Sequence, residues 1–193
     1  ERRLAASIEE MTPISDAVSL AVKQQYEENP YPRWVRPAPA PPARTKAEYF
    51  GDWLPAGAER ERVDILVAGC GTGQNLVETA RQFKNAQVLA IDLSRASLGY
   101  AKRQALALGL DNVTFAVADI LALELASSRF DIVDASGVLH HMADPWLGWR
   151  KLLALVRPGG FMRVGLYSRL ARADVNAARA LVAERSYPPT AEG

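Results

Sequence analysis

The fold of this chain is decided by the stretch Val63-Asp64-Ile65-Leu66-Val67-Ala68-Gly69-Cys70-Gly71-Thr72-Gly73-Gln74. Its short apolar run, Ile65–Ala68, is typical of a buried parallel strand. Three glycines then alternate with Cys70 and Thr72, and the apolar residues that follow recur along one helical stripe between Leu76 and Phe83. The stretch therefore predicts a strand, a glycine-rich loop and a helix, in that order.

The glycine loop is suited to holding a ligand, because without Cβ atoms its backbone can come close to one. The first turn of the following helix adds unpaired N–H groups and a positive dipole end, which favour an anionic group. A dinucleotide site requires Gly-x-Gly-x-x-Gly, whereas the spacing here is Gly-x-Gly-x-Gly followed by Gln74. The spacing therefore disfavours a nicotinamide-dependent oxidoreductase.

A second predicted strand, Gln87–Ile91, ends in an acidic residue. This residue is Asp92, which follows Gly69 by 23 positions. A carboxylate at the end of such a strand can accept hydrogen bonds from both hydroxyls of a ribose. The glycine loop and Asp92 together favour a ligand that contains a nucleoside.

The rest of the chain alternates between strand and helix patterns. Further strands are predicted over residues 113–117, 132–135 and 161–166, and helices over 95–108, 146–156 and 171–185. This alternation predicts an α/β fold, Rossmann-like and doubly wound, with a mostly parallel sheet and right-handed crossovers. Ligands in such sheets bind beyond the carboxyl ends of the strands. The glycine loop, Asp92, Asp119 and Ser136-Gly137 are all predicted to lie there.

Six short motifs between about residues 63 and 168 carry a family resemblance. They are Gly69-Cys70-Gly71-Thr72-Gly73, Ile91-Asp92-Leu93-Ser94, Ala118-Asp119-Ile120, Phe130-Asp131-Ile132-Val133, Gly137-Val138-Leu139-His140-His141 and Arg157-Pro158-Gly159-Gly160. In order and spacing they resemble the motifs of the class I S-adenosylmethionine-dependent methyltransferases. One position departs from the pattern: the family commonly has an acid two residues before the first glycine, and this chain has Val67.

The resemblance implies a class I methyltransferase fold with S-adenosylmethionine as the methyl donor. It implies that the donor is bound by Gly69, Cys70, Gly71, Gly73, Asp92, Leu93, Asp119, Ile120, Ser136 and Gly137. Within this set, the Asp119 carboxylate is expected to accept the adenine amino group while Ile120 touches the ring. The other interpretation of Asp119 is an acid that caps a turn.

His140 and His141 are the candidates for a catalytic role, because they follow the predicted strand 132–135 and can face the methyl acceptor. A general base is needed only if the acceptor arrives protonated. The alternative for both histidines is a polar loop that supports the site through hydrogen bonds. No Cys/His cluster has metal-ligand spacing, so no metal is expected.

Residues 1–60 are predicted to form an N-terminal helical arm, an aromatic-proline segment and a linker. The aromatic-proline segment is Tyr26–Trp34. We predict that Tyr26, Tyr31 and Arg33 close the donor pocket, with Arg33 answering the donor carboxylate. The alternative is an aromatic staple on the surface. A similar Asn-Pro-Tyr-Pro-Arg-Trp element occurs in a bacterial subgroup of these methyltransferases, some of which carry tetratricopeptide repeats, but that periodicity is absent here.

Residues 61–168 are predicted to form the S-adenosylmethionine-binding core, and residues 169–193 a C-terminal helix and tail. The class I methyltransferase fold ends in a strand hairpin. Residues 169–193 are too few to form this hairpin after the predicted helix. We therefore predict five core strands in an abbreviated or incomplete domain. The start of the chain lacks an initiator Met and resembles the middle of a longer protein.

Composition excludes several classes of protein. Lys and Arg number 23 and Asp and Glu 22, for a net charge of +1, so nothing global indicates nucleic acid or an anionic membrane. The sequence has no apolar run long enough for a membrane span, and its single cysteine fits the reducing cytoplasm. A methyltransferase acting on an unidentified acceptor is favoured. Two alternatives stay open: a non-catalytic regulatory module that binds the donor and, less favoured, a nicotinamide-dependent oxidoreductase.

Overall fold

A computed structural model describes residues 1–168 and 170–186 of the chain. Its strands form one parallel sheet in the order β1-β4-β3-β2-β5-β6. They are β1 (Glu9–Glu10), β2 (Val63–Ala68), β3 (Ala86–Asp92), β4 (Val113–Val117), β5 (Phe130–Ser136) and β6 (Val156–Gly165). The α-helices are α1 (Arg2–Ala6), α2 (Ala17–Glu28), α3 (Lys46–Phe50), α4 (Gln74–Gln82), α5 (Arg95–Ala107), α6 (Pro145–Leu153) and α7 (Ala173–Arg185). The short 3-10 helices are η1 (Gly51–Trp53), η2 (Ile120–Ala122) and η3 (Leu139–His141). This is the Rossmann-like α/β fold that the sequence predicts.

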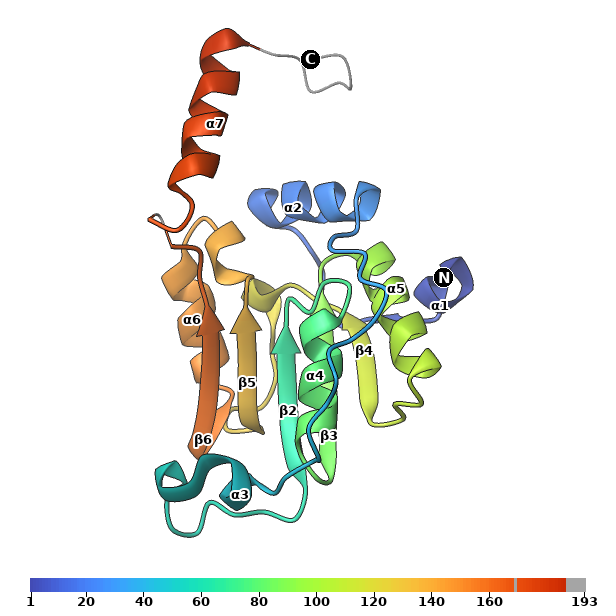
Figure 1. The fold of residues 1–193 in the computed structure, drawn as a ribbon, viewed down its shortest axis with the longest axis vertical. Coiled ribbons are helices and arrows are strands. Elements are labelled where there is room, and N and C mark those ends of the chain that lie inside the picture. Colours follow the sequence, from blue (N-terminus) through green and yellow to red (C-terminus); the bar gives the residue numbers. More distant parts are fainter. Residues whose placement is uncertain (169, 187–193) are drawn as a thin grey trace.

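Different helices cover the two faces of the sheet (Figure 1). Side chains alternate along a strand, so Ile65 and Val67 of β2 join the core cluster formed with α4 and α5. Leu66 and Ala68 join the cluster on the other face, which includes α6. The central strand β2 is therefore buried on both sides, which explains its continuous apolar run.

β6 begins earlier than the sequence predicts. The expected helix runs to residue 156 and the expected strand begins at Phe161, whereas α6 ends at Leu153 and β6 starts at Val156. The main-chain carbonyl of Leu155 accepts the N–H groups of Arg129 and Phe130, so the chain has left the helix there. An irregularity in the β5–β6 pairing accommodates the Pro-Gly-Gly run inside the strand.

β1 is a sixth strand that the sequence does not indicate. It pairs with β4 at the edge of the sheet, with Glu9 opposite Ala116, and the Met11 N–H donates to the Val117 carbonyl at 2.8 Å. A strand of two residues is too short to show a pattern of alternation. The sheet therefore has six strands where five were predicted. Within residues 170–186 the structure has α7 and no strand. The predicted tail over residues 187–193 lies outside the described residues.

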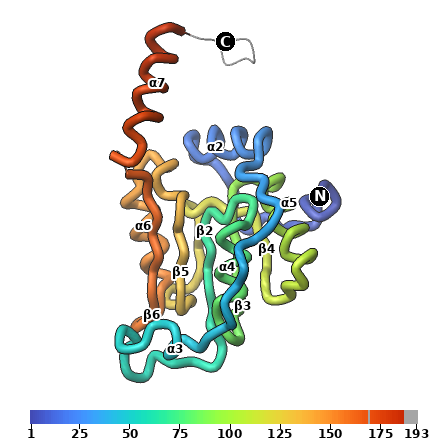
Figure 2. Tube along the Cα trace, viewed as in Figure 1, coloured from blue at the N-terminus to red at the C-terminus, as the bar shows by residue number. Residues whose placement is uncertain are grey.

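The chain between α2 and α3 connects the two ends of the sheet. It runs along the α4 side, from the carboxyl ends of the strands to their amino ends (Figure 2). The Arg44 N–H donates to the Gln82 carbonyl at 3.0 Å, and the Arg44 carbonyl accepts from Lys84 at 2.8 Å. The linker predicted within residues 1–60 is therefore extended along the domain over its proline-rich part, residues 37–42, and is fastened at its far end.

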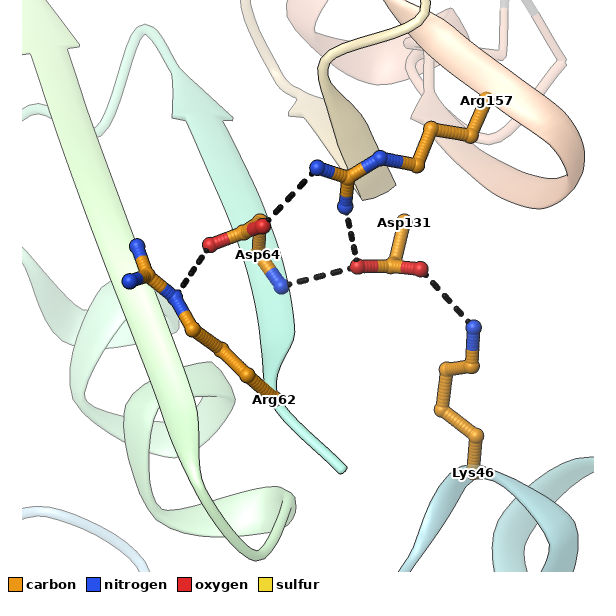
Figure 3. A network of polar contacts seen from close by, with 5 residues as sticks. All are labelled: Lys46, Arg62, Asp64, Asp131 and Arg157. Carbon is orange, nitrogen blue, oxygen red and sulfur yellow. Dashed lines mark hydrogen bonds and ion pairs between the residues drawn. The ribbon is translucent and has the colours of Figure 1, made fainter. Parts of the chain in front are cut away.

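A buried ionic network holds α3 against the amino ends of β2 and β5 (Figure 3). The Lys46 ammonium is 2.9 Å from Asp131 Oδ1, and the two side chains are 1% and 2% exposed. Asp131 Oδ2 accepts from Arg157 at 2.6 Å and from the Asp64 N–H at 3.0 Å. The network lies at the end of the sheet opposite the ligand-binding edge.

None of the described helices has the length and apolarity to cross a membrane.

Candidate functional site

A cavity of about 390 Å³ lies at the carboxyl ends of the strands, and α2 forms part of its wall. Its wall is formed by the glycine loop, the end of β3, the segments that follow β4, β5 and β6, and one face of α2. The sequence-predicted residues that line it are Gly69, Cys70, Gly71, Asp92, Leu93, Asp119, Ile120, Ser136, Gly137, Tyr26, Tyr31 and His141. The segments predicted to converge at this edge therefore do so. Their binding roles stay predictions.

The three loop glycines have positive φ angles and serve different purposes. At Gly69 (φ 70°) a Cβ atom would lie 2.4 Å from Val138, and at Gly73 (φ 85°) it would lie 2.7 Å from the Ala101 Cβ. At Gly71 (φ 53°) it would meet only a main-chain oxygen, 3.9 Å away. Gly71 is thus the position where the backbone is open to a ligand. Gly73 does not line the cavity, contrary to expectation, because it begins α4 and packs against α5.

Asp92 is fixed in the floor of the cavity by two main-chain donors. The Gly71 N–H donates to Oδ2 at 2.8 Å, and the Ser94 N–H donates to Oδ1 at 2.9 Å. Burial raises the pKa of the Asp92 carboxyl, while these hydrogen bonds act in the opposite direction. Each carboxylate oxygen keeps a second lone pair, so the group can still accept two hydroxyls from a ligand.

Asp119 caps a turn and also lines the cavity, so the turn-capping interpretation is confirmed and the ligand-binding role stays a prediction. Its Oδ1 accepts the Leu121 N–H at 2.9 Å and caps η2, which is the turn-capping interpretation. The same side chain lines the cavity, as the ligand-binding interpretation requires. The Asp119 N–H donates to the Thr12 hydroxyl at 2.8 Å. Thr12 belongs to the N-terminal arm, and no sequence pattern indicated this support.

The aromatic-proline segment is fastened to the glycine loop itself. The Trp34 indole donates to the Thr72 carbonyl at 2.9 Å, and the Thr72 hydroxyl donates to the Pro32 carbonyl. The Trp34 ring is buried against Val77 of α4 and Tyr100 of α5. The segment is thus a packed staple, and it also contributes Tyr26 and Tyr31 to the cavity wall.

Arg33 does not reach the cavity. Its neighbours Pro32 and Trp34 are both attached to the glycine loop, and Arg33 between them is exposed. The described residues that line the cavity include no lysine or arginine. Val67, which stands at the position where the family commonly has an acid, is buried in the apolar core. The expectation that Arg33 supplies a positive charge to the pocket is therefore wrong.

α2 is held over the cavity by an acidic residue that the sequence reasoning missed. The Glu27 carboxylate accepts the N–H groups of Arg95 at 2.6 Å and Ala96 at 3.1 Å, at the start of α5. An acid is favourable there, because the helix start has unpaired donors and a positive dipole end. α2 then presents Ser19, Val22 and Tyr26 to the cavity. Their i, i+3, i+7 spacing is the signal that could have identified this face.

The two candidate histidines differ in position. His141 lines the cavity, and its Nε2 lies 3.3 Å from the Tyr26 hydroxyl. Burial lowers the pKa of His141. His140 does not line the cavity: its ring lies 4.3 Å from that of His141 and 4.0 Å from that of Tyr167. Both buried ring nitrogens of His140 lack a partner among the described residues. Of the two candidates, His141 is the one that a ligand in the cavity can reach.

Replacing Trp34 with phenylalanine is expected to lower the free energy of unfolding by about 1–3 kcal/mol, because the buried Thr72 carbonyl loses its donor. Phenylalanine keeps most of the apolar contact with Val77 and Tyr100. The matched control is Trp53→Phe, whose indole is 83% exposed. Urea unfolding followed by circular dichroism measures both variants, and equal losses would show that the Trp34 hydrogen bond does not fasten the segment.

Sequence comparisons identify relatives over most of this region. Residues 65–160 match a family described as a methyltransferase domain. An uncharacterised protein of Synechococcus sp. is 28% identical over 165 residues, which are 83% of this chain and 40% of that protein. The ubiquinone biosynthesis O-methyltransferase of Paracidovorax citrulli is 31% identical over 122 residues, 63% of this chain and 50% of that enzyme. The chain thus spans half or less of the length of these two relatives.

A solved structure shares both fold and some sequence with the chain. It comes from a study of the conversion of a disulfide bond into a thioacetal group during echinomycin biosynthesis. The TM-score is 0.60 with 26% identity, over 91% of this chain and 71% of that one. This similarity supports the fold described above and covers more of the chain than the matched family region does.

Proposed function

Because residues 65–160 match a methyltransferase domain, we propose that this protein is a class I methyltransferase that binds S-adenosylmethionine in the cavity and transfers its methyl group to an acceptor. The observation that carries the proposal is the Asp92 carboxylate, held 2.8 Å from the Gly71 N–H in a cavity that the glycine loop lines. The match to the methyltransferase family supports it independently of this geometry.

Chemical fit supports the same donor. We assign Asp92 to the ribose hydroxyls, Asp119 and Ile120 to the adenine, and the loop backbone at Gly71 to the methionine end. The described lining has acidic side chains and no lysine or arginine, which suits a ligand that carries a sulfonium charge. The donor supplies a methyl group that is already activated for displacement. The protein then has to align donor and acceptor and exclude water, which can contribute up to about 7–11 kcal/mol.

Tyr26 and Tyr31 are proposed to close the donor side of the pocket. Both line the cavity, and the segment that carries them is attached to the glycine loop through Thr72. We further propose that the Asn29–Trp34 element places the protein in a bacterial subgroup of the family that acts in the cytoplasm. The resemblance of this element and the single cysteine of the chain support that assignment.

Isothermal titration calorimetry tests the choice of ligand. We expect binding of S-adenosylmethionine and of its demethylated product, and no binding of NAD. NAD binding in the absence of the other two would favour the oxidoreductase and contradict the proposal.

A second measurement separates an enzyme from a regulatory module. Purified protein is incubated with tritiated-methyl donor and an extract of its source cells, and protein-dependent labelling of an acceptor is expected. Donor binding without any transfer would favour the non-catalytic module.

A further inference from the structure

The donor proposed for the cavity carries a carboxylate at its methionine end, and the cavity wall has to accommodate this group. None of the described residues that line the cavity is a lysine or arginine. A carboxylate that leaves water without a cation needs hydrogen-bond donors in place of its lost hydration. Side-chain donors in the wall are therefore candidates for binding it, in addition to the backbone at Gly71.

The order of the strands indicates which part of the wall the carboxylate meets. Asp119 follows β4, Asp92 ends β3 and Gly71 follows β2, and these three strands are neighbours in that order. With its adenine at Asp119 and its ribose at Asp92, the donor lies across the strand ends from β4 towards β2. Its methionine end then points towards β5, the next strand in the sheet.

Asn75 lines the cavity on this side, from the first turn of α4. Its Nδ2 donates to Asp134 Oδ2 at 2.7 Å, and its Oδ1 accepts a hydrogen bond from the Arg163 guanidinium. Asp134 on β5 lies opposite Arg163 on β6 in the register of the sheet, and their side chains form an ion pair in which Asp134 is 1% exposed. The Asn75 amide is thus held between a buried carboxylate and a cation.

These two contacts fix which way the Asn75 amide faces. A guanidinium only donates hydrogen bonds, and a carboxylate only accepts them. The reversed amide would place its NH2 group against Arg163 and its oxygen against Asp134, which is unfavourable at both ends. Nδ2 carries two hydrogens. Asp134 takes one of them, and the other has no acceptor within the described part of the chain. Asn75 therefore keeps one oriented donor for a ligand.

Of the two charged groups at the methionine end, the carboxylate is the one that this donor suits. An ammonium has three donors and no acceptor, so it cannot pair with an N–H group. The Arg163 charge beside Oδ1 also disfavours an ammonium at the amide oxygen. Hydrogen bonds in a chain polarise one another, so the contact with Arg163 makes the Asn75 N–H a stronger donor.

Building on the proposed function, we propose that Asn75 binds the carboxylate of the donor and that Asp134 and Arg163 are positioning residues that orient its amide. Asp134 also accepts the N–H of Ser136, another lining residue, at 3.0 Å. Val67, where the family commonly has an acid, lies opposite Asp134 in the register, so in this chain the buried acid is on the neighbouring strand. The cluster makes the site selective for ligands that keep the carboxylate.

Ligands with and without the carboxylate test this selectivity by titration calorimetry, without any methyl transfer. The probes are S-adenosylmethionine, its decarboxylated form, which keeps the sulfonium and the ammonium, and 5′-methylthioadenosine, which lacks the whole amino acid end. We expect wild-type protein to bind S-adenosylmethionine at least about tenfold more tightly than the decarboxylated form. Equal affinities for these two ligands would overturn the inference.

Asn75→Ala is expected to weaken the binding of S-adenosylmethionine by about ten- to a hundredfold, because a hydrogen bond to a charged group is lost. The two ligands that lack the carboxylate should stay within about twofold of wild type. Equal weakening of all three ligands would show a defect in the fold of the glycine loop and would overturn the inference.

Asn75→Ser repeats the test in a variant that keeps the contact inside the cluster. Serine has a single O–H, which can donate to Asp134 and then leaves no donor for the ligand, so the same selective loss is expected. Asn176→Ala is the matched control, because Asn176 is exposed on α7 and lies outside the cavity lining. It should leave all three affinities unchanged.

Arg163→Lys tests the positioning role. Lysine keeps the charge beside Asp134 but lacks the planar fork of arginine, so the preference for the carboxylate should fall by less than in Asn75→Ala, with 5′-methylthioadenosine binding within about twofold. An unchanged preference would overturn the positioning role of Arg163. Wild-type protein that binds neither S-adenosylmethionine nor 5′-methylthioadenosine would contradict the proposed function itself. A preference that survives Asn75→Ala would contradict this inference alone.

Discussion

Replacing Asp92 with alanine is expected to weaken the binding of S-adenosylmethionine by about ten- to a thousandfold. Each hydrogen bond between a carboxylate and a ribose hydroxyl contributes about 1.5–3 kcal/mol, and tenfold in affinity corresponds to about 1.4 kcal/mol. The charged form is the better acceptor. Because burial raises the pKa of Asp92, donor affinity should fall as pH decreases through that raised value, at a higher pH than for an exposed aspartate.

Titration calorimetry at neutral pH measures this effect, and circular dichroism checks that the fold is intact. Asp111→Ala is the matched control, because Asp111 is exposed and lies outside the cavity lining, and it should leave affinity unchanged. Asp92→Asn, which removes the charge and keeps one carbonyl oxygen, should fall between wild type and Asp92→Ala. A folded Asp92→Ala protein with wild-type affinity would remove Asp92 from the site.

Replacing Asp131 with alanine is expected to lower the free energy of unfolding by about 3–5 kcal/mol, because it leaves the buried Lys46 ammonium without a counter-charge. Lys46 and Asp131 are 1% and 2% exposed and lie 2.9 Å apart. Arg157 contacts the other Asp131 oxygen at 2.6 Å and is mostly buried. The substitution also removes the hydrogen-bond acceptor of the Asp64 N–H at the start of β2.

Urea unfolding provides the measurement for the ionic network. Lys84→Ala is the matched control, since the Lys84–Glu48 pair is about half exposed on both sides and should contribute little to stability. If Asp131→Ala does not fold, Lys46→Met supplies the test: it leaves Asp131 paired with Arg157 and should cost less. Similar losses for Asp131→Ala and Lys84→Ala would show that burial of the network does not matter.

The elements around the glycine loop could be predicted because each carries its own local signal. β2 shows an apolar run, α4 an apolar stripe, and α5 begins at the Ser94 cap and ends next to Gly109. Strand–helix alternation then limits the topology to a parallel sheet with right-handed crossovers. The carboxyl ends of such strands share one edge, so Asp92 and Gly71 could be placed together before any coordinates were known.

Features that depend on a distant partner could not be predicted in this way. β1 has two residues and exists through its pairing with β4, more than a hundred positions away. The early start of β6 depends on its pairing with β5. From the sequence alone, Lys46 is expected to lie on the surface. It is buried because Asp131, 85 positions further on, neutralises its charge.

The candidate site also has parts that the sequence predicts and parts that only tertiary packing decides. Residue types and their spacing were sufficient to indicate the glycine loop, Asp92 and Asp119, because a parallel sheet brings its strand ends to one edge. Which member of a short segment faces the cavity was decided by packing. Trp34 and Pro32 attach to Thr72, and that contact turns Arg33 to solvent. His141 rather than His140 lines the cavity under Tyr26, because side-chain direction in a loop depends on contacts that no local pattern encodes.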